Sequence, residues 1–150
     1  MQLLPSYSNG IDIYGTFNKK VAQVLTINYQ PAFSWNRVQF KDDDVNSAYQ
    51  TFRLDSRLNL DFNLSKSMLV EIAARQSFTQ QSDFGSRKYL FCDLNVKKNL
   101  KKNRLDLSLD ITNIFNVKDY TFYYSQTNQL LVNHYEIRGR MAILRVESYF

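Results

Sequence analysis

Several residue types that carry chemistry are scarce in this chain of 150 residues. It has a single cysteine, Cys92, and a single histidine, His134. One cysteine excludes an internal disulfide framework and a multi-cysteine metal site, and one histidine removes most histidine-based metal and catalytic sites. No nucleophile–base pair can be built from these two residues at their positions. We therefore expect no enzymatic activity, no metal site and no cofactor.

Long apolar runs are missing as well. No stretch of about 18 apolar residues occurs, so no transmembrane helix is predicted. Residues 1–6 have neither a basic region nor a long apolar one, so we expect no signal peptide on this chain. The net charge is +5 and the pI about 9.3. The basic residues are scattered apart from one cluster at positions 97–104, so we expect no nucleic-acid partner.

What the sequence has in abundance is alternation with a period of two. Between Phe52 and Leu64, the even positions are apolar except for Ser56, and the odd positions are Arg, Asp or Asn. Successive side chains of a strand point to opposite faces, so this segment is predicted to be a strand of about thirteen residues with one apolar and one polar face. Residues 21–35, 68–78, 89–96 and 104–111 follow the same rule, and helical periodicity is nearly absent.

The predicted fold is all-β, a single domain over residues 1–150 formed by an antiparallel up-and-down meander of about seven long strands. The strands are predicted at roughly 10–17, 20–40, 50–64, 67–79, 87–98, 103–123 and 129–150. Short connections are expected near 18–20, 65–67 and 99–103. Longer ones are expected at 41–49, 80–87 and 116–133, the last as a projecting hairpin. Short and long connections would then lie at opposite edges of the sheet.

These features favour a membrane barrel over a soluble one. Strands of globular proteins are typically about five or six residues long, whereas nine to eleven tilted residues cross a bilayer. Charged residues on one face and leucines on the other suit a water-filled interior and a lipid-facing exterior. We expect the convex face to carry Leu54, Leu58, Leu60, Leu105, Leu107, Leu109, Val146 and Phe150. The alternative is a soluble or small complete up-and-down barrel whose apolar face lines a cavity for a small ligand.

The end of the chain is itself an alternating strand. Ala142, Leu144, Val146 and Phe150 share one face of it. A terminal phenylalanine at this position suits an anchor in the aromatic girdle at a membrane interface. We therefore interpret this segment as the closing strand of a barrel.

Two motifs in this region resemble a known family. The segment Asp110-Ile111-Thr112-Asn113-Ile114-Phe115-Asn116 resembles the N-[IL]-F-N stretch that precedes the final hairpin of TonB-dependent outer-membrane receptors. Arg138-Gly139-Arg140, which leads to the C-terminal aromatic residue, resembles their last strand. The resemblance is clear over residues 103–150 and is a pattern match over 10–100. Asn113, Ile114, Phe115 and Asn116 are expected to form a structural feature at a strand end.

The resemblance implies a protein of the cell outer membrane with a 22-stranded barrel and an N-terminal plug, which takes up iron chelates or glycans. It also implies that the terminal phenylalanine is read by the barrel-assembly machinery. Bacterial barrels have an even number of strands, so seven strands predict an open, C-terminal segment of a larger barrel. The expected partners are outer-membrane lipid, the missing N-terminal strands and plug, and the assembly machinery. A complete eight-stranded barrel is the rival interpretation.

Four further features of the sequence are considered as possible sites. Tyr120, Phe122, Tyr123 and Tyr124 are candidates for extracellular contacts with a ligand, although an aromatic belt or packing within a hairpin is the favoured explanation. Residues 42–44 are three aspartates, which suit either Ca²⁺ or a solvated charge run. Cys92 is expected to act as a small apolar residue, and His134 as a solvated loop residue.

Overall fold

A computed structural model describes residues 6–41, 46–82, 84–100, 104–126 and 129–149. This part of the chain contains ten strands and no helix. The strands are β1 (Ser6–Tyr14), β2 (Phe17–Ala22), β3 (Leu25–Lys41), β4 (Asn46–Ser65), β5 (Met68–Gln81), β6 (Gly85–Leu100), β7 (Leu105–Thr112), β8 (Asp119–Gln126), β9 (Gln129–Glu136) and β10 (Met141–Ser148).

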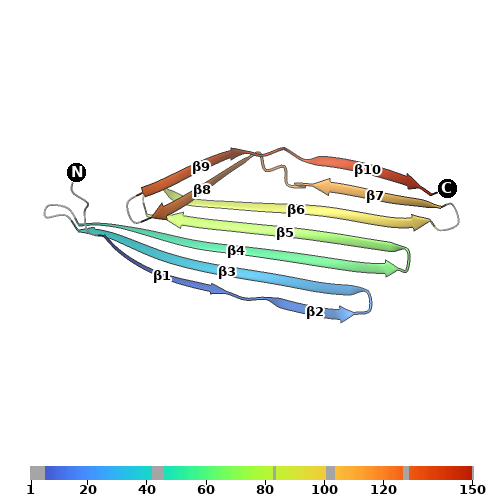
Figure 1. The fold of residues 1–150 in the computed structure, drawn as a ribbon, viewed down its shortest axis with the longest axis horizontal. Coiled ribbons are helices and arrows are strands. Elements are labelled where there is room, and N and C mark those ends of the chain that lie inside the picture. Colours follow the sequence, from blue (N-terminus) through green and yellow to red (C-terminus); the bar gives the residue numbers. More distant parts are fainter. Residues whose placement is uncertain (1–5, 42–45, 83, 101–103, 127–128, 150) are drawn as a thin grey trace.

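The strands form one large antiparallel sheet and one separate hairpin. The order in the large sheet is β1-β3-β4-β5-β6-β7-β10, and β2 also pairs with β3. Since β1 and β2 follow one another along the same side of β3, the sheet has seven wall positions (Figure 1). β8 and β9 pair only with each other. The predicted meander of about seven strands is therefore confirmed.

The register aligns the apolar residues in rows across the sheet. One row crosses six strands and contains Ile27, Leu60, Ile72, Leu94, Ile111 and Ala142. The next comprises Leu25, Phe62, Val70, Val96, Leu109 and Leu144. In β3 the apolar positions run from Leu25 to Trp35. At about 3.3 Å per residue and a tilt of about 45°, that segment is about 25 Å tall, the height of the apolar band of a membrane barrel.

The polar face is the concave one. A hollow of about 970 Å³ is bounded by residues from all seven wall positions, between Tyr14 at one edge of the sheet and Met141 at the other. Several charged side chains of the polar face, among them Arg57, Arg75 and Asp93, line this hollow. The leucines predicted for the convex face lie on the opposite side, by the register of their strands. Phe150 lies outside the described residues.

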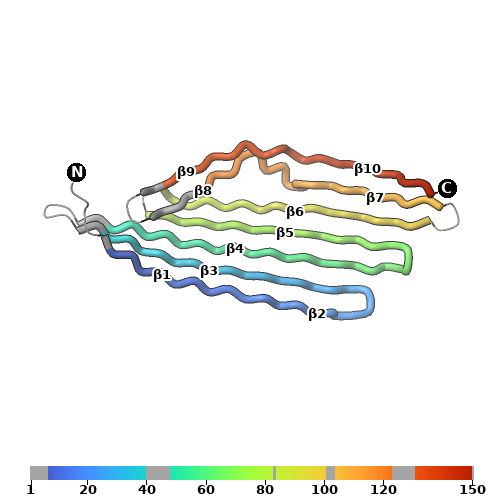
Figure 2. Tube along the Cα trace, in the orientation of Figure 1, coloured from blue at the N-terminus to red at the C-terminus, as the bar shows by residue number. Residues whose placement is uncertain are grey.

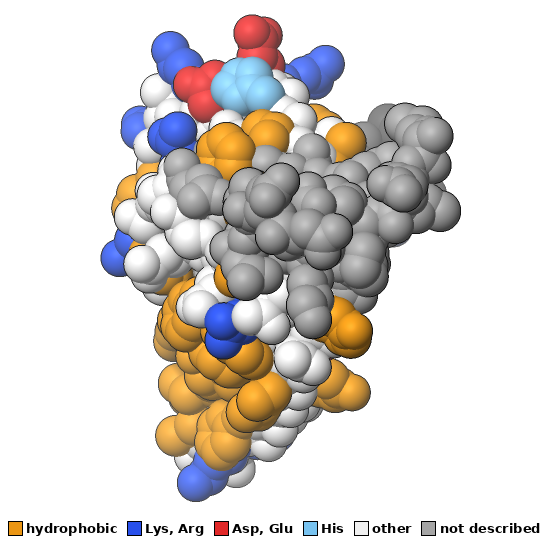
Figure 3. All heavy atoms as spheres, turned by 90° about the vertical axis from the view of Figure 1, so that its left-hand side faces the viewer, with side chains coloured by type: hydrophobic (Ala, Val, Ile, Leu, Met, Phe, Trp, Pro, Cys, Tyr) orange, Lys and Arg blue, Asp and Glu red, His pale blue; other side chains and the backbone are white. Residues whose placement is uncertain are grey.

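The sheet has almost no core of its own. Val38, which is 2% exposed, is the only buried hydrophobic residue of the described part. Large apolar side chains face outward instead, such as Ile11 at 54%, Leu144 at 68% and Val146 at 59% exposure. Hydrophobic side chains are visible along the side of the molecule in the view along the strands (Figure 3). Such a surface needs an apolar environment to cover it. No described helix is long and apolar enough to span a membrane.

The first wall strand differs from its prediction. A strand was expected over 10–17 and a turn at 18–20, but β1 begins at Ser6 and β2 continues to Ala22. The turn lies at Gln23–Val24. The gap between β1 and β2 faces Pro31, which has no N–H to donate, and the Gly15 N–H donates to the Pro31 carbonyl there at 3.0 Å. The polar residues 18–20, which were expected to form a turn, are therefore part of strand β2 and pair with β3.

The first two of the three expected long loops also consist largely of strand in the described residues. β3 runs to Lys41 and β4 begins at Asn46, while β5 ends at Gln81 and β6 begins at Gly85. The polar residues at these ends pair with one another and extend the wall beyond the apolar band. Sequence polarity at this edge was therefore misread as loop. The aspartates at 42–44 lie outside the described residues.

The last two predicted strands are each broken in two. In place of the strand predicted at 103–123 the structure has β7 and β8, with a break at 113–118, and in place of the strand predicted at 129–150 it has β9 and β10, with a break at 137–140. The trace leaves and rejoins the sheet at these two neighbouring points (Figure 2). The predicted hairpin exists, but its two strands leave the sheet within the wall and not at the edge where the long loops were expected.

The two faces of the sheet predict opposite responses to a charge. Ile72→Arg, on the apolar face of β5, should lower the free energy of unfolding from lipid vesicles by about 2–4 kcal/mol. Ala73→Arg is the matched control on the polar face, beside Asp93 in the register, and should cost far less. Urea titration of the full chain folded into vesicles measures both. Equal losses would show that the two faces are assigned wrongly.

Candidate functional site

The polar face is a network of paired charges. Lys97 lies 3.3 Å from Glu71, Arg75 3.6 Å from Asp93 and Arg145 2.5 Å from Asp110, each pair bridging neighbouring strands. Asn95 also donates to Asp110. The charged side chains of the three ion pairs are between 20% and 56% exposed, so each contributes less than about 1 kcal/mol. Their common effect is to present a hydrated wall.

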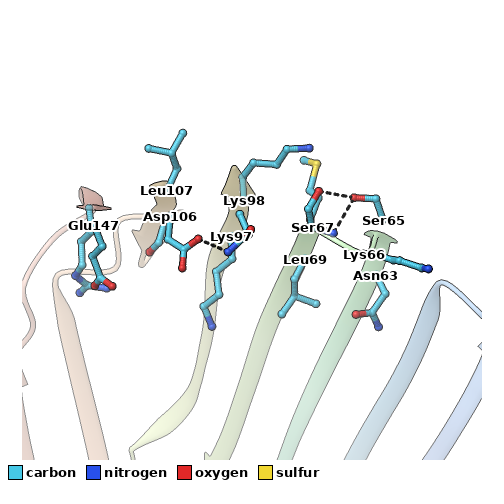
Figure 4. A pocket seen from close by; sticks show the side chains of 14 residues that line it. Asn63, Ser65, Lys66, Ser67, Leu69, Lys97, Lys98, Asp106, Leu107 and Glu147 are labelled. Carbon is cyan, nitrogen blue, oxygen red and sulfur yellow. Dashed lines mark hydrogen bonds between the residues drawn. The ribbon is translucent and has the colours of Figure 1, made fainter. Parts of the chain in front are cut away.

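A smaller hollow of about 440 Å³ lies at the end of this face where β4 turns into β5 (Figure 4). There Asn99 Nδ2 donates to Asp106 Oδ1 at 2.5 Å, and the Tyr149 hydroxyl donates to the other oxygen of the same carboxylate, also at 2.5 Å. The bond to Asp106 raises the pKa of Tyr149, because it stabilises the protonated phenol. Asp106 thus ties the end of the chain beyond β10 to β7.

Asn113 organises the break in the wall. It is buried, at 7% exposure, and has a φ of 53°. Its backbone N–H donates to Asp93 Oδ1 at 2.8 Å, and its side chain donates to the carbonyls of Val117 at 2.7 Å and Arg138 at 3.0 Å. The Asn113 Oδ1 accepts from the Val117 N–H at 2.9 Å. One amide side chain therefore holds together both segments that leave the sheet.

Asn116 completes the same junction. It also has a positive φ, 56°, and its Oδ1 accepts from the Arg140 N–H at 3.0 Å. Gly139 lies against it, and a Cβ at that position would be 2.8 Å from Asn116 Oδ1. Asparagine tolerates this left-handed conformation better than most residues. Any side chain at Gly139 would therefore displace the Asn116 side chain that accepts from the Arg140 N–H. Phe115, which lies between Asn113 and Asn116 in the same motif, is 56% exposed.

The hairpin beyond the junction leans over the polar face. The Tyr120 ring of β8 is 4.8 Å from Tyr89 and 6.1 Å from Phe91, both on β6. The Thr121 N–H donates to the Tyr89 hydroxyl at 3.0 Å. The guanidinium of Arg53, on β4, lies 4.3 Å from the centre of the Phe122 ring. These contacts cross β5 and β6, so the hairpin covers part of the hollow.

The structure describes the side chains of two of the four candidate ligand-contact residues. Tyr120 and Phe122 pack against the wall, and Tyr120 also lines the large hollow. The side chains of Tyr123 and Tyr124 lie outside the described part. His134 Nε2 is 3.7 Å from Asp119 Oδ1, and its Nδ1 is 3.1 Å from Thr121 Oγ1, so this histidine joins β9 to β8.

The closing-strand residues lie on an edge of the sheet. β10 pairs with β7, and it is the end of the strand order. Ala142, Leu144 and Val146 are exposed on the apolar face there. At the opposite end of the order lies β1.

Sequence reasoning missed the roles of Asp93, Tyr89 and the facing arginines Arg57 and Arg75. The alternation places all of them on the polar face, but which of them meet depends on register between strands. The register puts Arg57 directly opposite Arg75. Nothing in either segment alone signals that pairing.

Comparison with known proteins gives one match. A family model described as the outer membrane protein beta-barrel family matches residues 5–149. No curated protein and no solved structure shows significant similarity to the chain.

The junction predicts a sharp contrast within the N-I-F-N motif. Asn113→Ala should lower the free energy of unfolding by about 2–4 kcal/mol, because it removes the partner of three partly buried backbone groups, the Val117 N–H and the carbonyls of Val117 and Arg138. Phe115→Ala, two residues away, removes an exposed ring and should cost much less. The two variants are compared by urea unfolding in vesicles, with protease cleavage between β7 and β8 as a local probe. A larger loss from Phe115→Ala would contradict the role given to Asn113.

Proposed function

The chain belongs to the outer membrane protein beta-barrel family and lies in the cell outer membrane, and we propose that it forms part of the barrel wall of a TonB-dependent receptor. The receptor would take up a nutrient such as an iron chelate or a glycan. In this proposal the chain has no catalytic role and does not bind nucleic acid.

The observation that carries the proposal is the polarity of the curved sheet. Its concave face holds the charged side chains and a hollow of about 970 Å³, and its convex face holds rows of aliphatic residues. A wall of this kind suits a hydrated passage surrounded by lipid. The soluble alternative requires the reverse, with the ligand cavity on the apolar face. The motif resemblance at Asn113–Asn116 and Arg138–Arg140 supports the receptor assignment within the wider family.

The two edge strands of the sheet are the basis for the proposed partners. β1–β2 and β10 stand at opposite ends of the strand order. In lipid each unsatisfied backbone group costs several kcal/mol, so both edges need further strands. We propose that these strands, together with a plug, complete the barrel. Lipid would cover the convex face, and the barrel-assembly machinery would insert the protein.

The exposed apolar face predicts a need for an amphiphile. The full chain should acquire β-structure in detergent micelles or lipid vesicles and aggregate in buffer alone, because Val38 is the only buried hydrophobic residue described. Far-UV circular dichroism and light scattering measure this. A folded, monodisperse chain in plain buffer would favour the soluble barrel.

Transport predicts an energy-dependent phenotype. Cells that lack the gene should lose uptake of at least one labelled iron chelate or oligosaccharide, and a protonophore should abolish the same uptake in the parent strain. Restoring the gene should restore uptake, whereas a copy with Asn113→Ala should restore it poorly. Uptake that persists in the protonophore would indicate a passive pore and would overturn the receptor assignment.

A further inference from the structure

We propose that the polar face carries a binding site for an aromatic carboxylate, centred on Arg57 of β4 and Arg75 of β5. The inference goes beyond the barrel-wall role and does not depend on energy-coupled transport.

The two arginines face each other without adequate partners. They are directly opposite in the β4–β5 register, and both are exposed on the concave face. Like charges in this position destabilise a sheet. Arg57 makes no ion pair or hydrogen bond to another described residue. Among the residues that the structure describes, the one ion-pair partner of Arg75 is Asp93, at 3.6 Å, and that carboxylate also accepts the Asn113 N–H.

The chemistry of the pair selects a planar oxyanion. Each guanidinium presents a rigid fork of donors, which matches the two oxygens of a carboxylate. A carboxylate between the two groups would replace their repulsion with charge-assisted hydrogen bonds. Arg57 and Arg75 therefore form a site that gains most from binding an anion.

An aromatic wall lies beside this pair. Phe91 is directly opposite Arg75 in the β5–β6 register, and the Tyr120 ring lies 6.1 Å from that of Phe91. Both line the same hollow. Aromatic rings prefer tilted or offset neighbours at such distances, so a ligand ring can pack here while its carboxylate meets the arginines.

The net charge of the hollow agrees with an anionic ligand. Its lining contains four arginines and two aspartates. Asp93 is engaged as described, and Asp55 lies 2.8 Å from the Arg53 Nε. The excess of positive charge in a concave site concentrates anions near it.

The first test measures stability without ligand. Arg57→Gln should raise the stability of the full chain in detergent micelles, because it removes a repulsion and breaks no ion pair. The control is Lys20→Gln, on the same face but outside the hollow, which should leave stability nearly unchanged. A clear loss of stability in Arg57→Gln would assign the residue a structural role and overturn the proposal.

The second test measures binding with three probes by ligand-observed NMR titration. Benzoate should bind more tightly than inorganic phosphate, which lacks the ring, and than benzylammonium, which has the opposite charge. Arg57→Gln should weaken benzoate binding by about tenfold, the effect of one charge-assisted interaction. Lys20→Gln should bind as the parent chain does.

A conservative double variant distinguishes a loss of binding from misfolding. Arg57→Lys with Arg75→Lys keeps both charges but loses the planar forks, so benzoate binding should fall while the fold is retained. Equal affinity for benzoate and benzylammonium, equal affinity for benzoate and phosphate, or unchanged benzoate binding in Arg57→Gln would each overturn the proposal.

Discussion

The backbone ladder is the interaction on which the rest of this structure depends. With Val38 as the one buried hydrophobic residue described, the wall has no interior to hold it together. The β3–β4 ladder instead pairs every residue from Leu25 with Phe62 to Lys41 with Asn46. In lipid an unpaired backbone amide stays unsatisfied, because the bilayer core holds no water to form a hydrogen bond with it. Side chains are then free to specialise, and each face takes the polarity of the medium that it meets.

The break at Asn113 shows what it takes to interrupt such a ladder. Where β7 leaves the wall, the lost backbone partners are replaced by the Asn113 side chain, by Asp93 and by Asn116. The Ile114 N–H still donates to the Cys92 carbonyl at 2.8 Å. Hydrogen bonds therefore bridge the interruption, which brings aromatic residues of β8 over a face that is otherwise charged.

Local alternation was sufficient to predict the fold class, the two faces and the strands from β3 to β6. It could not locate the breaks, because Asp119–Gln126 and Gln129–Glu136 have strand-like composition whether or not they lie in the wall. It also misread the polar ends of β3 and β4 as loop, since pairing between two polar strands leaves no apolar signal. The facing pair Arg57 and Arg75 was invisible for a related reason: a shift of one residue in register would put these side chains on opposite faces.

The separation of the β8–β9 hairpin from the large sheet has a mechanical consequence. Its ladder is continuous from Asp119–Glu136 to Gln126–Gln129 and shares no rung with β7 or β10. The hairpin is therefore an arm that is joined to the wall at its base and through the contacts of Tyr120, Thr121 and Phe122 with β6 and β4. Eight residues of strand make an arm of about 26 Å, so a tilt of about 10° displaces its far end by about 4–5 Å without breaking one rung of the wall. A rotation at the base of the hairpin would thereby be amplified above the hollow.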